Sequence, residues 1–180
     1  MHLYQHINVL DARAPWQTFF NAWLETDRGP TRNIEVNEQW SMDRICRRIL
    51  QSSEQLAASC RHTGLGVLRL VCHGNAGIVQ LGSGFSEATI GSFRLLRGHF
   101  AGRYPRIEVL ACGVLSSTEV SRERPEGTVD LNSAGHALMW TLADAAQVLV
   151  IAAYNLQLHY PNGSMAYEGP VRHFRPRTSP

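Results

Sequence analysis

The chain has 180 residues, of which 44% are hydrophobic and 18% are charged, proportions that suit one globular domain with a buried core. Its formal net charge of +2 is too small to indicate nucleic-acid binding, and no apolar run reaches the roughly 18 residues that are needed to cross a bilayer. We therefore predict a single domain over residues 1–169, without nucleic-acid or membrane partners, followed by a partly disordered tail rich in proline and arginine over residues 170–180.

The N-terminal residues and the cysteines both favour a cytoplasmic protein. Residues 1–10 contain no basic stretch followed by a continuous apolar run, as a secretory signal would require. The four cysteines include no CxxC pair, so neither a redox motif nor a zinc ribbon is indicated. Free thiols are the usual state in the reducing cytoplasm, and we expect this protein to be located there.

In the first third of the chain, apolar residues alternate between strand-like and helix-like spacing. The predicted strands cover residues 1–10 and 33–36, and the predicted helices cover residues 15–24 and 41–61. Pro15 suits the first turn of the first helix, and Ser41 is a suitable N-cap for the second. The apolar stripe of the second helix includes Cys46 and Cys60, which we therefore assign to the core.

The remaining two thirds of the chain continue this alternation. The predicted strands cover residues 68–73, 78–81, 107–113 and 148–153, and the predicted helices cover residues 86–99 and 133–146. We interpret the polar segment over residues 116–132 as a mobile loop that binds substrate. This order of strands and helices predicts an α/β fold with a mainly parallel sheet between layers of helices.

Two of the predicted strands end in a reactive side chain followed by glycine. One apolar run ends in His73-Gly74 and another ends in Cys112-Gly113. Functional groups collect beyond the carboxyl ends of parallel strands. If these strands are neighbours, the imidazole of His73 and the thiol of Cys112 lie side by side, as a base and a nucleophile do in covalent catalysis. Cys72 points to the opposite face of the sheet, and we assign it to the core.

Such a pair predicts nucleophilic catalysis by a thiol. A free thiol, with a pKa of about 8.5, is only a few per cent thiolate at neutral pH, so a neighbouring imidazole would activate Cys112 or protonate the leaving amine. The N–H of Gly74, together with that of Cys112, would form an oxyanion hole. This chemistry requires neither a cofactor nor a metal.

The segment around His73 resembles a pattern of the caspase-like cysteine peptidases. In that pattern an apolar strand precedes His-Gly-x-x-Gly, and a later strand ends in Ala-Cys or Gly-Cys. Here residues 73–82 read HGNAGIVQLG, with one extra residue, and Ala111-Cys112 ends the later strand. The similarity continues over residues 135–143, 148–153 and 168–176. The chain is most similar to an uncharacterised bacterial caspase-like domain found at the N-terminus of large surface proteins. The superfamily also includes caspases, legumains, gingipains, separases and the CHAT proteases.

This resemblance implies a caspase-like three-layer αβα sandwich with strand order 2-1-3-4-5, which makes the strands before His73 and Cys112 neighbours. It implies a cysteine endopeptidase whose substrate is a protein or peptide. It also implies that the histidine acts on the leaving group without an obligatory third member. It also implies a substrate groove that includes the segment after the fifth strand, here Tyr154 and Asn155, whose main chain would bind an extended peptide. Arg69 departs from the pattern, because an apolar residue is expected there; it either pairs with an acid or extends to the surface.

Two alternatives to the peptidase remain open. The first is a catalytically inactive caspase-like module for protein interaction, since a fold does not by itself guarantee an activity. The second is a metal-dependent hydrolase, in which His99 and His136 join His73 and Cys112, although their spacing matches no zinc signature.

The sequence leaves the partners less defined. Asp130 is the loop carboxylate that we would select to bind an arginine side chain of a substrate. Arg44, Arg47 and Arg48 form either a solvated helix face or a surface for an acidic partner. A protein activator is compatible with this reading, and the sequence indicates neither the preferred cleavage site nor the oligomeric state.

Overall fold

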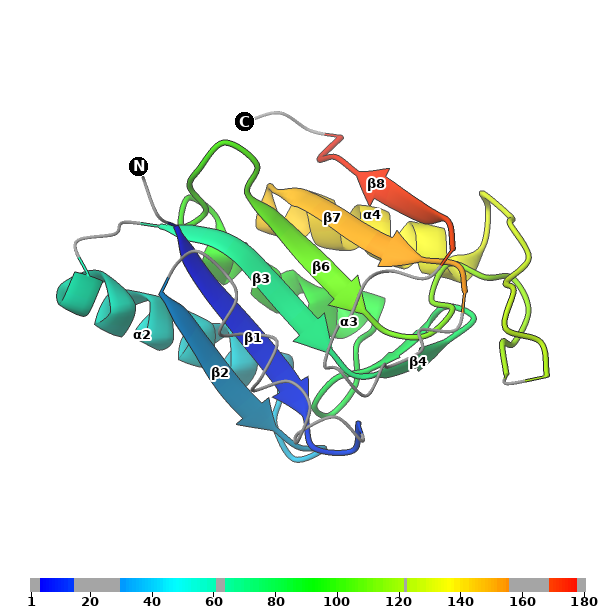
Figure 1. The fold of residues 1–180 in the computed structure, drawn as a ribbon, viewed down its shortest axis with the longest axis horizontal. Helices are drawn as coiled ribbons and strands as arrows, with labels where there is room; N and C mark the ends of the chain where they lie inside the picture. The colour runs from blue at the N-terminus through cyan, green and yellow to red at the C-terminus, as the bar shows by residue number, and fades with distance from the viewer. Residues whose placement is uncertain (1–3, 15–29, 61–63, 122, 156–168, 178–180) are drawn as a thin grey trace.

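A mostly parallel, six-stranded β-sheet forms the centre of the protein, which has an α/β fold (Figure 1). The structure is a computed structural model that describes residues 4–14, 30–60, 64–121, 123–155 and 169–177. The sheet has the order β2-β1-β3-β6-β7-β8, and β4 pairs with β5 in a separate two-stranded sheet. The strands are β1 (Gln5–Asp11), β2 (Thr31–Val36), β3 (Leu65–Val71), β4 (His73–Asn75), β5 (Ile78–Gln80), β6 (Arg106–Leu110), β7 (Leu149–Ala153) and β8 (Val171–Phe174).

The strands β2, β1, β3, β6 and β7 pair in parallel, which confirms the predicted kind of sheet. A central parallel strand is covered on both faces and reads as a continuous apolar run; all seven residues of β3 are buried. The strands that lead to His73 and Cys112, β3 and β6, are neighbours, as predicted. The observed order differs from 2-1-3-4-5 because a sixth strand, β8, pairs antiparallel with β7.

The strand β8 lies beyond residue 169, where the domain was predicted to end and a partly disordered tail to begin, so the ordered domain extends further than predicted. Phe174 is fully buried, and its ring packs edge-on against Trp140 with the ring centroids 5.2 Å apart. Just beyond β8, the N–H of Arg177 donates to Asp144 Oδ1 at 2.7 Å, and its Nη2 donates to Oδ2 at 2.6 Å. Burial of one aromatic ring and the pairing with β7 therefore order a segment whose composition suggested disorder.

The described helices lie on one face of the sheet, behind it in Figure 1, and η1 contacts both α2 and α4. They are α2 (Met42–Cys60), α3 (Glu87–Ile90), the 3-10 helix η1 (Gly91–Leu96) and α4 (Ala134–Ala146). Ser41 caps α2 as predicted, because its Oγ accepts the N–H of Arg44 at 3.2 Å. The predicted helix over residues 86–99 is instead two short pieces that meet at Gly91, a poor α-helix former. The helix predicted over residues 15–24 lies outside the described residues.

The opposite face of the sheet holds a buried ion pair. Arg69 Nε donates to Glu108 Oε2 at 2.8 Å, and the two residues are only 4% and 9% exposed. Of the two alternatives for Arg69, pairing with an acid is therefore the one observed. His73 and Cys112 lie just beyond the carboxyl ends of the two strands that carry this pair, where the β3–β6 pairing has ended.

Candidate active site

The segment that carries His73 continues from β3 and then turns back on itself as the β4–β5 hairpin. The two turn residues, Ala76 and Gly77, both have positive φ angles of 34° and 83°, as a type I′ turn requires. The pair that closes such a turn is hydrogen-bonded, and bonded pairs alternate with non-bonded pairs along the ladder. Gly74 and its partner Val79 form the next, non-bonded pair, so the N–H of Gly74 points away from β5.

The pairing of β3 with β6 brings His73 and Cys112 to the same edge of the sheet. Val71 lies opposite Leu110, and one residue further the N–H of Cys72 donates to the Leu110 carbonyl at 3.3 Å. His73 then begins β4 and Cys112 begins a turn, so both residues lie two positions beyond the carboxyl ends of neighbouring strands. The main chains of both residues are therefore at the same edge of the sheet.

The glycine after each reactive side chain lets two main chains approach closely. A Cβ at Gly74 would lie 2.8 Å from the Cβ of Ala111 and 2.9 Å from the carbonyl oxygen of Ile78. Gly113 has a φ of +51°, and a Cβ there would meet Val120 at 2.5 Å. No larger residue fits either position without displacing the hairpin or the chain that follows β6.

The turn that begins at Cys112 is hydrogen-bonded on both sides. On one side, the N–H of Ala76 in the hairpin turn donates to the Gly113 carbonyl at 3.0 Å. On the other side, the N–H of Gly113 donates to the Asn155 carbonyl at 2.8 Å, just past the end of β7. The candidate nucleophile is therefore held between the His73 hairpin and β7.

The segment over residues 116–132, which was predicted as a mobile loop, is anchored at its base. The side chain of Asn75 accepts the N–H of Val120 at 2.9 Å and donates to the Val120 carbonyl at 3.2 Å. Ser116 Oγ accepts the N–H of Thr128 at 3.0 Å, which ties the two ends of the loop together. These bonds hold the loop beside the hairpin that carries His73.

The ring of His73 has one nitrogen occupied by a backbone carbonyl. Its Nε2 lies 2.9 Å from the carbonyl oxygen of Arg13. A carbonyl oxygen only accepts, so Nε2 carries the proton in this bond, and the neutral ring has its lone pair on Nδ1. Nδ1 is therefore the atom through which His73 would accept a proton. The Arg13 carbonyl is a third partner that the sequence analysis did not identify.

The other described cysteine side chains are poor nucleophiles. Burial raises the pKa of the Cys46 thiol to about 12, with a smaller contribution from Asp43. Burial also raises the pKa of Cys72 well above its usual range, and the charge of Asp11 adds to this effect. Cys112 forms no disulfide bond and is only half-buried. Cys112 is therefore the least buried of these three cysteines, and its role as the nucleophile stays a prediction.

Tyr154 and Asn155 follow β7 where the substrate groove was predicted, but several of their polar groups are bonded within the chain. The Tyr154 side chain is buried, its hydroxyl lies 2.7 Å from His136 Nε2, and its N–H donates to the Pro170 carbonyl. The Asn155 carbonyl accepts the N–H of Gly113. A peptide would therefore have to bind other main-chain atoms of this segment, and the phenol is not available to it.

The remaining predicted site residues form neither a metal site nor an acidic pocket with His73 and Cys112. Asp130 is exposed and accepts a backbone N–H in the turn before α4. His99 is exposed, whereas His136 is buried with its nitrogens 2.8 Å from Ser133 Oγ and 2.7 Å from the Tyr154 hydroxyl. Among the residues that the structure describes, no three His, Cys, Asp or Glu side chains could hold a metal ion.

Two residues near His73, Asp11 and Arg13, lie beyond the strand predicted over residues 1–10, and the sequence analysis gave them no role. The fully buried carboxylate of Asp11 accepts Nε and Nη2 of Arg13, each at 2.8 Å, and the N–H of Gly82 at 2.8 Å. Burial raises the pKa of Asp11, but the hydrogen bonds from Arg13 and Gly82 outweigh this effect and lower it overall. The available signal was an Asp-x-Arg sequence at the carboxyl end of an apolar strand.

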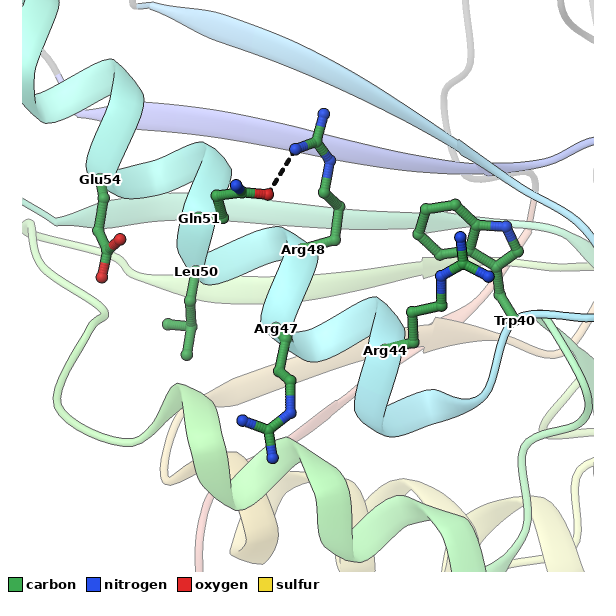
Figure 2. Close-up of a pocket in the computed structure, with 7 residues that line it drawn as sticks. All are labelled: Trp40, Arg44, Arg47, Arg48, Leu50, Gln51 and Glu54. Carbon is green, nitrogen blue, oxygen red and sulfur yellow. Dashed lines mark hydrogen bonds between the residues drawn. The ribbon is translucent and has the colours of Figure 1, made fainter.

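A separate groove lies on the outer face of α2 (Figure 2). None of the residues described above around His73 and Cys112 line it. The groove has a volume of about 710 Å³. The guanidinium of Arg44 lies over the Trp40 ring, 3.9 Å from its centroid. Arg47 pairs with Asp43 at 2.7 Å, whereas Arg48 points to the other side of the helix in Figure 2. Arg44 and Arg47 are exposed, as the sequence predicted, whereas Arg48 is half-buried.

Comparisons of the chain with protein-family models, with curated proteins and with solved structures each found no match. No helix in the described part of the chain is long and apolar enough to cross a membrane. Functional interpretation therefore depends on the geometry of the site.

Proposed function

We propose that this chain is a caspase-like cysteine endopeptidase with a three-layer αβα fold, in which Cys112 is the nucleophile and His73 transfers protons. The observation that carries the proposal is the pairing of β3 with β6, because His73 and Cys112 follow these neighbouring strands two residues beyond their carboxyl ends. The carbonyl of Arg13 supports a defined role for His73, because it occupies Nε2 and leaves Nδ1 to take the proton.

In the proposed reaction, the sulfur of Cys112 attacks the scissile carbonyl carbon while His73 Nδ1 accepts the thiol proton. The carbonyl oxygen becomes an oxyanion, which the N–H groups of Gly74 and Cys112 would stabilise. When the C–N bond breaks, His73 gives the proton to the leaving amine, and a thioester remains. Water then attacks the thioester, which releases the acid and restores the thiol.

The test is cleavage of a diverse peptide pool by the purified chain. The wild type should cleave a subset of peptides, and Cys112→Ala should abolish cleavage, because no other described cysteine can replace the nucleophile. Cys46→Ala is the matched control, since it also removes one thiol but from the core, and it should retain activity. A peptidyl acyloxymethyl ketone should modify Cys112 in the wild type. Cleavage that survives Cys112→Ala would exclude the proposed mechanism.

A second candidate function is a catalytically inactive caspase-like module that binds a protein partner. The groove on α2 favours it, because a stacked Arg44–Trp40 pair at a surface can bind acidic or aromatic groups (Figure 2). This candidate predicts no cleavage of any peptide and no preferential labelling of Cys112 by the ketone.

A further inference from the structure

The end of β1 is joined to the β4–β5 hairpin by a dense set of hydrogen bonds. Arg13 Nη2 donates to the carbonyls of Gln80 and Gly82, at 3.0 Å and 2.8 Å, in addition to its bonds with Asp11. Asp11 itself accepts the N–H of Gly82. The Asp11–Arg13 pair, here called the clamp, therefore fixes the segment where β5 ends.

The same residue also contacts the imidazole. The main-chain carbonyl of Arg13 accepts a hydrogen bond from His73 Nε2. The side chain of Arg13 donates to the carbonyl of Gln80, which lies opposite His73 in the hairpin. The N–H of Arg13 donates to Asp11 Oδ1 at 3.1 Å, so the carboxylate also fixes the backbone to which that carbonyl belongs. Displacing the Arg13 backbone would move the carbonyl and free the ring to change tautomer.

The clamp differs from a typical surface ion pair because its carboxylate is fully buried. The Asp11 side chain has no exposed area, and that of Arg13 is 36% exposed. Removing the charge of a buried carboxylate costs free energy of folding, because the N–H groups that donate to it lose their charged acceptor. The geometry of the hairpin therefore depends on both members.

We infer that Asp11 and Arg13 are positioning residues for the candidate active site: they set the tautomer of His73 and hold the hairpin that presents the Gly74 N–H, without touching the substrate. This inference rests on the proposed function for its kinetic consequence. Its structural consequence, a His73 ring protonated at Nε2 in the neutral form, stands apart from peptidase activity.

The experiment compares Asp11→Asn and Arg13→Lys with Asp144→Asn. The control pair is matched, since Asp144 also accepts both the side chain and the N–H of an arginine, Arg177, but on the far side of α4. Each clamp variant should lower kcat about 10- to 100-fold with KM within about twofold, because small displacements of a catalytic group have effects of that order. Asp144→Asn should leave both constants unchanged.

The second readout is the ¹⁵N spectrum of the histidine rings, with the His73 signals assigned through His73→Gln. The wild type should show protonated Nε2 at high pH, and the clamp variants should show a mixture of tautomers. Wild-type tautomer and wild-type kcat in both folded clamp variants would overturn the inference. If Asp11→Asn does not fold, Arg13→Lys, which keeps the positive charge, decides. A wild type that cleaves nothing would defeat the proposed function alone, because the ring spectra would still test the clamp.

Discussion

Two histidines, His73 at the start of β4 and His136 in the first turn of α4, occupy opposite kinds of environment. His73 is half-buried at the sheet edge, with one ring nitrogen bonded to a carbonyl. His136 is 2% exposed, and hydroxyl groups of Ser133 and Tyr154 contact both of its nitrogens. The same side chain thus has one nitrogen bonded within the described chain in one place and both nitrogens bonded in the other.

This difference shows that the unoccupied nitrogen, and not the residue type, distinguishes a candidate catalytic histidine from a structural one. Burial lowers the pKa of His136, and the positive charge of Arg172 lowers it further, so the interior ring is kept neutral. A neutral ring between two hydroxyls serves to satisfy buried hydrogen bonds. The comparison can be tested by changing each ring in turn.

The largest expected effect is on catalysis. His73→Ala should lower kcat/KM for a cleaved peptide by about 10²- to 10⁴-fold, the usual contribution of general acid–base catalysis. It should shift the thermal midpoint by only a few degrees, because the ring is half-buried. His136→Ala should do the reverse, with a large loss of stability. Equal losses of stability in the two variants would remove the distinction.

The next largest effect concerns the thiols. At pH 7.5, iodoacetamide should modify Cys112 about 100-fold faster than Cys46 or Cys72, since each unit by which burial raises a thiol pKa lowers the thiolate fraction about tenfold. Peptide mapping by mass spectrometry, in a Cys60→Ser background, measures the three rates. In 6 M urea the rates should converge, and a preference that persists there would show that the fold is not its cause.

A moderate effect is expected in the pH dependence of stability. A histidine whose folded pKa is lowered contributes stability that is complete above about pH 6.5 and is lost as the pH falls through the folded pKa. Urea unfolding of the wild type should therefore show decreasing stability below about pH 6.5. His136→Phe should flatten this dependence and cost about 1–3 kcal/mol at pH 8, because two hydroxyl groups lose their partner. An unchanged pH slope would mean that another group titrates.

The smallest effect is local. Asn75→Ala removes both hydrogen bonds to Val120 and should cost about 1–2 kcal/mol in the free energy of opening the 116–132 loop. Hydrogen exchange of that loop should accelerate, while exchange in β3 and β6 stays unchanged. Ser121→Ala, in the exposed part of the same loop, is the control. Equal acceleration in the control would mean that Asn75 does not anchor the loop.

Much of the fold could be predicted because each central strand carries its own signal. β3 is apolar apart from Arg69, β6 carries its apolar residues around Glu108, and α2 begins after a serine whose hydroxyl accepts a backbone N–H. The edge strand β8 was missed because it is short, is flanked by proline and arginine, and has its only buried ring at Phe174. β8 is ordered by its pairing with β7, and no local pattern in residues 171–174 indicates that pairing.

The candidate site was predicted only in part for a similar reason. The reactive residues His73 and Cys112 stand at the ends of recognisable strands. The contact with the Arg13 carbonyl could not be predicted from residue types, since every residue has a main-chain carbonyl. Tyr154 was assigned to the groove by its position after a strand, yet its side chain turns inward to His136.

The sequence by itself determined that apolar strands alternate with helices and that a histidine and a cysteine each follow such a strand, because periodicity and residue type are local properties. Tertiary structure decided which strands became neighbours, in what register, and which polar atoms were left without an internal partner. Those outcomes depend on contacts between residues far apart in the chain: the β3–β6 pairing spans about forty residues, and the bond from His73 to Arg13 spans sixty.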